Sequence, residues 1–184
     1  MKDTYIHLTT KTTSYVLKIN KYGHLENIHY GGLLSNEEDY KVLENKQGNM
    51  LGTSTVYSGE KDDTYTLDNV SLEVGTIGKG DYRKPSLLLS HELGFTSDFI
   101  VKEHGFASPS SLDKNALPIP KNADEYYYFL LEDKVSKTQI KLDYLIFKST
   151  NVIARRVVIL KGAATLLKAA SFNLDLPNDH YDVY

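Results

Sequence analysis

Cysteine is absent from this 184-residue sequence, and so is tryptophan. Without cysteine the chain can form no disulfide, bind no metal through a thiolate and use no thiol as a catalytic nucleophile. No apolar run approaches the roughly 20 residues that a membrane-spanning helix needs, so we expect no membrane partner. The first residues also lack an apolar core of signal-peptide length, which together with the missing cysteines predicts a cytoplasmic protein.

Excess charge of either sign is also small. The formal net charge is -3, too low to indicate a polyanionic partner or an anionic membrane surface. Nucleic-acid-binding proteins usually carry a basic patch, and the sequence has none beyond the pair Arg155 and Arg156. We therefore expect no nucleic-acid partner. Hydrophobic residues at 41% and charged residues at 24% are ordinary values for a folded globular chain.

Much of the sequence alternates apolar with polar residues, and this period of two predicts β-strands. In segment 14–19, Tyr15, Leu17 and Ile19 share one face, and segment 24–30 returns after a short turn. Two such segments around a turn are typical of a β-hairpin.

The C-terminal half repeats the same pattern. In segment 138–147, Ile140, Leu142, Tyr144 and Ile146 share one face. Further strands are expected at 86–90, 98–104, 126–131, 151–160 and 166–176. The last of these overlaps a stretch, 163–170, that has some helical propensity, but its flanks alternate and favour a strand.

Turn signals separate these segments at intervals of about ten residues, which is typical of a β-sandwich. The stretch 35–63 has few apolar residues and predicts a long irregular surface segment with at most short strands, and 105–122 predicts a loop. The sequence thus predicts an all-β fold class, a large antiparallel β-sandwich with few or no helices. We expect residues 1–184 to form a single domain.

Motifs for nucleotide, metal or serine chemistry are missing. The glycine-rich stretch 75–80 lacks the Lys-Ser/Thr ending of a phosphate loop, and Asp81 after it would repel phosphate. The six histidines show no metal-ligand spacing, and the sequence contains no Gly-x-Ser-x-Gly elbow. We predict no metal site and no cofactor.

Four aspartates lie next to predicted structured segments: Asp68, Asp81, Asp175 and Asp179. A glycosidase needs two carboxylates across a cleft. The sequence does not pair them, and aspartate at a turn often bonds to nearby backbone N–H groups, so each is interpreted first as a turn residue. Asp81 precedes Arg83 by two residues. The two could form an internal ion pair or reach sugar hydroxyls, and we favour the ion pair.

Short matches along the chain resemble the N-terminal part of glycoside hydrolase family 36 α-galactosidases. One is residues 78–85, Gly-Lys-Gly-Asp-Tyr-Arg-Lys-Pro, preceded by Leu67-Asp68. Others are Ser14-Tyr-Val, Gly23-x-Leu25, Tyr30-Gly31, Leu117-Pro118, Asn151-Val-Ile-x-Arg155 and the segment 174–182. They follow the family's order over nearly the whole chain. The sequence departs from the family at Glu73-Val74, where relatives have Glu-Tyr, and over 40–63, where little matches beyond Asp62-x-Thr64-Tyr.

The resemblance implies a β-supersandwich that precedes a catalytic (β/α)₈ barrel and a small C-terminal β domain. In this family both catalytic aspartates lie on the barrel, so it implies no catalytic residue within 1–184 and no cofactor. The parent enzyme is expected to hydrolyse α-galactosides such as melibiose and raffinose with retention. Relatives also include α-N-acetylgalactosaminidases and raffinose synthases.

The resemblance also bears on partners. Bacterial members are often tetramers, in which a loop of the N-terminal domain can approach a neighbouring active site. It therefore implies a homo-oligomer, with the chain's own barrel as a further partner. Asp81 and Arg83 become candidate substrate-binding residues across a subunit interface.

Two other functions stay open, a stand-alone carbohydrate-binding module and a structural interaction domain. A binding module usually presents an exposed aromatic platform, often built from tryptophan, and the chain has no tryptophan. The ordered matches favour an accessory domain of an α-galactosidase.

The substitution Arg83→Ala separates the two interpretations of Asp81 and Arg83. A shielded charge-assisted bond contributes about 1.5–3 kcal/mol, so we expect the variant chain to melt at a lower temperature. We expect a secondary effect on the Michaelis constant of the full enzyme. An unchanged melting temperature together with a large rise in the Michaelis constant would move both residues into the substrate site.

Overall fold

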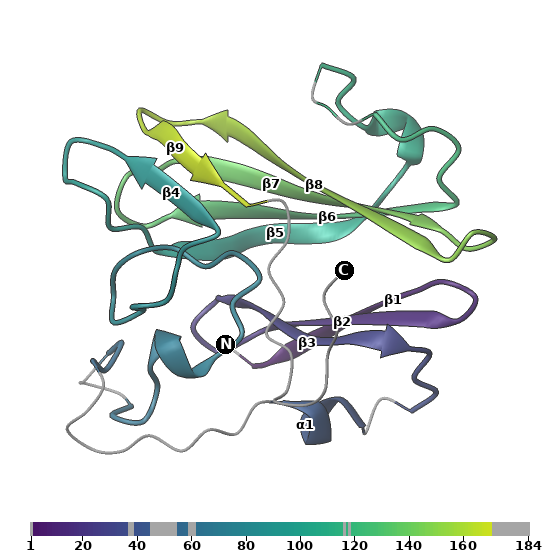
Figure 1. The fold of residues 1–184 in the computed structure, drawn as a ribbon, viewed down its shortest axis with the longest axis horizontal. Helices are drawn as coiled ribbons and strands as arrows, with labels where there is room; N and C mark the ends of the chain where they lie inside the picture. Colours follow the sequence, from purple (N-terminus) through teal and green to yellow (C-terminus); the bar gives the residue numbers. More distant parts are fainter. Residues whose placement is uncertain are drawn as a thin grey trace.

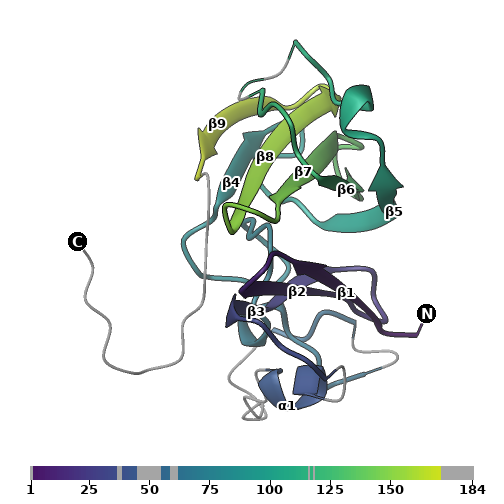
Figure 2. The ribbon, with the colours of Figure 1, turned by 90° about the vertical axis from the view of Figure 1, so that its right-hand side faces the viewer.

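Antiparallel strands make up most of the structure. The computed structural model describes residues 2–36, 39–44, 55–58, 62–115, 117 and 119–170. Its strands form sheets of three, four and two members. Figure 1 shows the three-stranded sheet stacked against the four-stranded one, and Figure 2 shows the same two layers from the side. This sandwich confirms the predicted all-β fold class.

The three-stranded sheet contains the predicted hairpin. In the order β1-β2-β3, its strands are β1 (Thr4–Thr9), β2 (Thr13–Ile19) and β3 (Leu25–Gly32). Gly23 closes the β2–β3 turn with a φ of 91°, a conformation that residues with a Cβ rarely adopt. The sequence analysis did not predict β1, although its alternation buries Ile6 and Leu8.

The four-stranded sheet is an antiparallel meander. Its strands are β5 (Phe99–Ala107), β6 (Glu125–Asp133), β7 (Gln139–Phe147) and β8 (Val152–Lys161), paired in chain order. All four were predicted, and β5 extends three residues beyond the expected end at His104. The predicted loop therefore begins after Ala107, and it includes the 3₁₀ helix η3 (Pro109–Ser111).

The third sheet joins two segments that are far apart in sequence. Strand β4 (Leu87–Ser90) pairs antiparallel with β9 (Thr165–Ala169), and Leu87 lies opposite Ala169. The stretch with helical propensity is thus a strand, as predicted, because pairing with β4 satisfies its backbone. The expected continuation of this strand to Leu176 lies outside the described residues.

Helical residues are few. Among its described residues, the stretch 35–63 holds one helical turn, α1 (Tyr40–Leu43), where at most short strands were expected. This turn places the Tyr40 ring against β1, where its hydroxyl lies 2.6 Å from His7 Nδ1. A second 3₁₀ helix, η2 (Leu67–Asn69), follows later. Among the described residues, no helix has the length and apolar character needed to cross a membrane.

The core lies between the two larger sheets. It contains the side chains that the alternation had assigned to one face of each strand. From β2 these are Tyr15, Leu17 and Ile19, and from β7 they are Ile140, Leu142, Tyr144 and Ile146. Leu87 and Leu89 of β4 join the same cluster. The period of two therefore predicted the inward face of these strands correctly.

One buried carboxylate connects the two sheets. Glu73 accepts hydrogen bonds from Tyr15 OH of β2 at 2.6 Å, from Tyr144 OH of β7 at 2.7 Å and from Arg155 Nε of β8 at 2.6 Å. Asn27 Nδ2 of β3 donates to it at 3.2 Å. Burial and the nearby Glu73 charge raise the pKa of both tyrosines, so the phenols remain protonated donors. A single side chain thus bonds to strands of both layers.

The substitution Glu73→Gln tests this connection. It keeps the size of the side chain but deprives Arg155 of a buried counter-charge, a change that typically costs about 3–5 kcal/mol. We expect the free energy of unfolding, measured by urea denaturation, to fall by that amount. The exposed control Glu92→Gln should stay within about 0.5 kcal/mol of the unsubstituted chain. Equal stabilities for the two variants would contradict the role given to Glu73.

Candidate functional site

The loop that carries Asp81 and Arg83 lies between η2 and β4 and depends on glycine. Gly78 has a φ of 113°, and a Cβ at that position would lie 2.4 Å from Thr96 Cγ2. The Asp81 N–H donates to the Gly78 carbonyl oxygen at 3.1 Å, which closes a tight turn. The glycines therefore bend the backbone as expected and turn Asp81 inward, where it is buried.

Arg83 and Asp81 form a two-point ion pair within this loop. Arg83 Nε donates to Asp81 Oδ1 at 3.0 Å, and Nη2 donates to Oδ2 at 3.1 Å. The backbone N–H of Arg83 also donates to Oδ1, at 3.1 Å. Such fork-to-fork geometry is among the stronger hydrogen-bonded arrangements in proteins.

Arg83 also links the loop to the preceding 3₁₀ helix. Its Nη2 donates to the carbonyl oxygen of Leu67 at 2.8 Å. The Arg83 side chain is 37% exposed, whereas the Asp81 side chain is 3% exposed. These contacts agree with the internal role that the sequence analysis favoured. Contact of either residue with a substrate stays a prediction.

Of the other three candidate aspartates, the structure describes Asp68 alone. Asp68 lies in η2, next to Leu67, and its Oδ1 is buried and accepts no hydrogen bond from the described residues. Asp175 and Asp179 lie outside the described residues. In the part of the chain that the structure describes, Asp81 therefore pairs with a cation.

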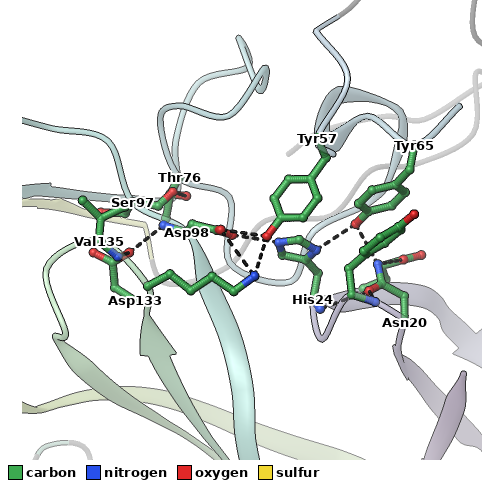
Figure 3. Close-up of polar contacts among 12 residues, drawn as sticks. Asn20, His24, Tyr57, Tyr65, Thr76, Ser97, Asp98, Asp133 and Val135 are labelled. Atoms are coloured by element: carbon green, nitrogen blue, oxygen red, sulfur yellow. Dashed lines mark hydrogen bonds and ion pairs between the residues drawn. The ribbon is translucent and has the colours of Figure 1, made fainter. Parts of the chain in front are cut away.

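A separate polar cluster of His24, Tyr57, Tyr65 and Asp98 lies where the β2–β3 turn meets the start of β5 (Figure 3). His24 Nε2 is 2.9 Å from Asp98 Oδ1, and His24 Nδ1 is 2.9 Å from Tyr65 OH. Tyr57 OH donates to Asp98 Oδ2 at 2.8 Å. We call these four residues the His24 cluster.

Asn20 determines where the protons of the His24 cluster lie. Its Nδ2 donates to Tyr65 OH at 2.7 Å and to Glu26 Oε1 at 2.6 Å. Because the Tyr65 oxygen accepts this bond, its own O–H can donate to His24 Nδ1. An N–H on His24 Nε2 can then donate to Asp98 Oδ1, 2.9 Å away.

The β6–β7 turn completes the surroundings of Asp98. Asp133 Oδ1 accepts from the Asp98 backbone N–H at 2.7 Å, and Lys134 Nζ donates to Tyr57 OH at 2.6 Å. The same Nζ lies 3.7 Å from Asp98 Oδ2. Figure 3 shows these groups arranged along one line of contacts from Asp133 to Asn20. The His24 cluster therefore joins segments from three separate parts of the chain.

Tyr22 lies next to the His24 cluster and extends its contacts toward the surface. Its ring stacks on Tyr65 with centroids 4.3 Å apart, and its hydroxyl donates to Asp62 Oδ2 at 2.9 Å. Lys21 Nζ lies 2.7 Å from the same oxygen. Stacking and hydrogen bonds thus hold residues 55–58 and 62–65 against the β2–β3 turn.

The bonding of the His24 cluster decides what it can do chemically. Both ring nitrogens of His24 and both carboxylate oxygens of Asp98 are in bonds within the chain, and both side chains are buried. Burial raises the pKa of Tyr57 and of Tyr65, which keeps both phenols protonated. The bonds of the cluster position the segments that it joins.

Sequence reasoning gave these residues no role. The bonded pairs of the His24 cluster are separated by 41 to 74 residues, so no local spacing could have indicated them. The one signal was the short match Asp62-x-Thr64-Tyr. In the described part of the chain, no group of three or more metal-ligating side chains is placed to hold an ion.

A model of the glycosyl hydrolase family 36 N-terminal domain matches residues 23–184. The chain belongs to this family. Arg155, which ends the short match Asn151-Val-Ile-x-Arg155, is the residue that bonds to Glu73 between the sheets.

Two curated relatives of this chain are α-galactosidases. AgaSK of Mediterraneibacter gnavus, a bifunctional α-galactosidase/sucrose kinase, is 27% identical over 96% of this chain and 19% of its own length. Mel36A of Lactobacillus acidophilus is 28% identical over 96% of this chain and 25% of its own length. The chain therefore spans at most a quarter of these relatives.

Solved structures show the same fold. The α-galactosidase from Lactobacillus brevis superposes with a TM-score of 0.76 at 21% identity, covering 94% of this chain and 24% of that one. The galactosidase domain of AgaSK gives a TM-score of 0.75 at 25% identity, covering 90% and 24%. The family 36 chain thus corresponds in fold to a part of these larger enzymes.

The substitution Asp98→Asn tests the His24 cluster and has a predictable pH dependence. Burial acts to raise the pKa of Asp98, but the contacts with His24 and the hydrogen bond from Tyr57 outweigh it and lower the pKa. A lowered pKa in the folded state contributes stability above the unfolded value of about 3.9, and this stability is lost as the pH falls through the folded pKa.

We therefore expect Asp98→Asn to lower the free energy of unfolding by about 1.5–3 kcal/mol at pH 7, the range for bonds to a charged group. The difference from the unsubstituted chain should shrink as the pH falls below about 3.9, because the unfolded wild-type chain then binds a proton at Asp98, which the folded chain takes up only at lower pH. Chemical denaturation between pH 7 and pH 3 measures both, with exposed Asp63→Asn as the control. A difference that stays constant over this range would refute the assignment.

Proposed function

We propose that this chain is the N-terminal accessory and oligomerisation domain of a retaining α-galactosidase. The observation that carries the proposal is the family match over residues 23–184 together with relatives that are four to five times longer and act as α-galactosidases. The parent enzyme would hydrolyse terminal α-galactosyl residues of oligosaccharides such as melibiose and raffinose. An α-galactosidase variant from Geobacillus stearothermophilus was solved in complex with raffinose, which supports this substrate class.

We place the chemistry outside this chain. Retaining hydrolysis uses two carboxyl groups about 5 Å apart, one as nucleophile and one as acid and base. Four buried acidic side chains of the described residues, Glu73, Asp81, Asp98 and Asp143, are bonded to cations or imidazole of the same chain. A fifth, Asp133, accepts bonds from turn N–H groups and from the Ser136 hydroxyl. Carboxylates engaged in this way are poor candidates for attack on a sugar, which supports an inactive fragment.

Assembly and location are part of the proposal. We propose a homo-oligomeric, cytoplasmic parent protein in which residues 1–184 form one domain beside the catalytic barrel. The Asp81–Arg83 loop lies at the surface through Tyr82, whose side chain is 79% exposed and whose hydroxyl lies 3.0 Å from Thr55 Oγ1. If this loop contacts a sugar across a subunit interface, Tyr82 has the exposed ring for it.

The proposal predicts that the purified 184-residue chain does not hydrolyse an aryl α-galactoside. Activity is measured as nitrophenol release against a buffer blank. Turnover that survives repurification would show that the catalytic pair lies within this chain.

The length of the reading frame provides the second test. A continuation of several hundred residues with the alternating strands and helices of a barrel supports an accessory domain of a larger enzyme. A stop codon directly after Tyr184 would favour a stand-alone binding module or a structural interaction domain instead.

A further inference from the structure

Strand β5 carries two exposed rings at one edge of the four-stranded sheet. Within the described structure β5 pairs with β6 alone, and Figure 2 shows it at the outer side of this sheet. Phe106 is 65% exposed, and His104 is exposed as well. The register places them opposite Tyr127 and Phe129 of β6, so all four rings lie on one face of the sheet. We call these four residues the His104 platform.

The two β6 rings hold the two exposed rings in place. Tyr127 and Phe129 are buried and belong to the main core. The Phe106 ring meets the Tyr127 ring edge-on with centroids 4.8 Å apart, and the His104 ring stacks on Phe129 with centroids 5.8 Å apart. The Tyr127 hydroxyl lies 2.6 Å from His104 Nδ1. A surface fixed in this way loses little conformational entropy when a ligand binds.

The contact with Tyr127 decides which chemistry His104 offers. Burial raises the pKa of Tyr127 and lowers the pKa of His104, so at neutral pH a protonated phenol faces a neutral imidazole. The phenol O–H can then donate to Nδ1, and an N–H remains on Nε2. His104 Nε2 has no hydrogen-bond partner among the described residues. The platform therefore combines an exposed apolar ring with an uncharged N–H donor.

This combination fits a sugar ring. A pyranose presents C–H groups on one face, which pack on an aromatic ring, and hydroxyl groups at its rim, which accept hydrogen bonds. Side chains two residues apart on a strand are separated by about 7 Å, so one sugar can contact both Phe106 and His104. The neighbouring charges of Lys102 and Glu103 offset each other, which favours a neutral ligand. A protein partner would need a larger surface, about 800 Å² on each side.

We propose that the His104 platform binds a pyranoside unit of an oligosaccharide through the Phe106 ring and His104 Nε2. The choice of an α-galactosyl unit as this pyranoside rests on the proposed function, whereas the rings and the donor do not depend on it. The absence of tryptophan counted against a binding module in the sequence analysis, but an exposed phenylalanine ring provides the same kind of stacking surface. The proposal gives this chain an affinity for sugar without a catalytic residue.

An NMR titration of the backbone amides of the 184-residue chain with raffinose tests the platform. We expect saturable shifts of the Gly105, Phe106 and Tyr127 signals. The dissociation constant should be on the order of 1 mM, because one stacked ring and one hydrogen bond provide little affinity. Sucrose, which is raffinose without its α-galactosyl unit, should bind at least about tenfold more weakly.

Substitutions separate the ring from the donor. Phe106→Ser should weaken raffinose binding at least about tenfold, because the stacking surface is lost, whereas Phe106→Tyr keeps the ring and should retain binding. His104→Ala should weaken binding about fivefold, a typical effect of losing one hydrogen bond. The matched control Phe95→Ser removes a 52% exposed ring between β4 and β5 and should leave binding unchanged. Amide signals outside the platform that match the unsubstituted chain show that each variant is folded.

Three outcomes would count against the proposal. Raffinose shifts that do not saturate, or that persist in Phe106→Ser, would overturn it. Platform signals that shift with the concentration of the chain in the absence of sugar would assign the surface to a second copy and overturn it as well. Equal binding of sucrose and raffinose would overturn the choice of the α-galactosyl unit.

Hydrolysis of an aryl α-galactoside by the longer protein from the same reading frame keeps this test separate from the proposed function. Activity of the longer protein without raffinose shifts in the 184-residue chain rejects the platform and leaves the function in place. Saturable shifts without activity reject the function and leave the platform in place.

Discussion

A carboxylate enclosed between two sheets must find charged or hydrogen-bonding partners on both sides, because an unpaired buried charge would cost several kcal/mol. Glu73 meets this requirement by bonding to Arg155 of β8, Tyr144 of β7 and Tyr15 of β2. These bonds form only when β2, β7 and β8 have a fixed register and lie at a fixed distance from one another. The packing of the sandwich therefore depends on this single cluster as much as on the apolar residues around it.

The same arrangement recurs at other buried acids. Asp143 is bonded by Arg156 Nε at 2.6 Å and by Tyr126 OH at 2.6 Å, and Asp98 is bonded by histidine and tyrosine. This use explains the composition, in which tyrosine is frequent and tryptophan absent. A tyrosine ring fills the interior of a sandwich while its hydroxyl reaches a carboxylate. The polar chemistry of these buried acids is thus directed inward, toward the packing of the sandwich.

Much of the fold could be predicted from the sequence because it depends on local alternation. The inward faces of β2 and β7 follow directly from the period of two, and the β2–β3 hairpin follows from the turn that ends at Gly23. Strand β1 escaped prediction because its six residues begin close to the N-terminus with few apolar positions. The turn α1 escaped as well, since it is favoured by contacts of Tyr40 with Tyr5 and His7, which are distant in sequence.

By itself, the sequence determined the fold class, the family and the loop in which Arg83 pairs with Asp81, because each of these depends on residues close together along the chain. Tertiary structure alone decided the pairing of β4 with β9, the His24 cluster and the bond between Glu73 and Arg155. Those contacts join residues separated by 41 to 82 positions. No periodicity or local spacing encodes such a pair. It forms only when the packed strands bring two buried polar groups within bonding distance, where leaving either one unpaired would be costly.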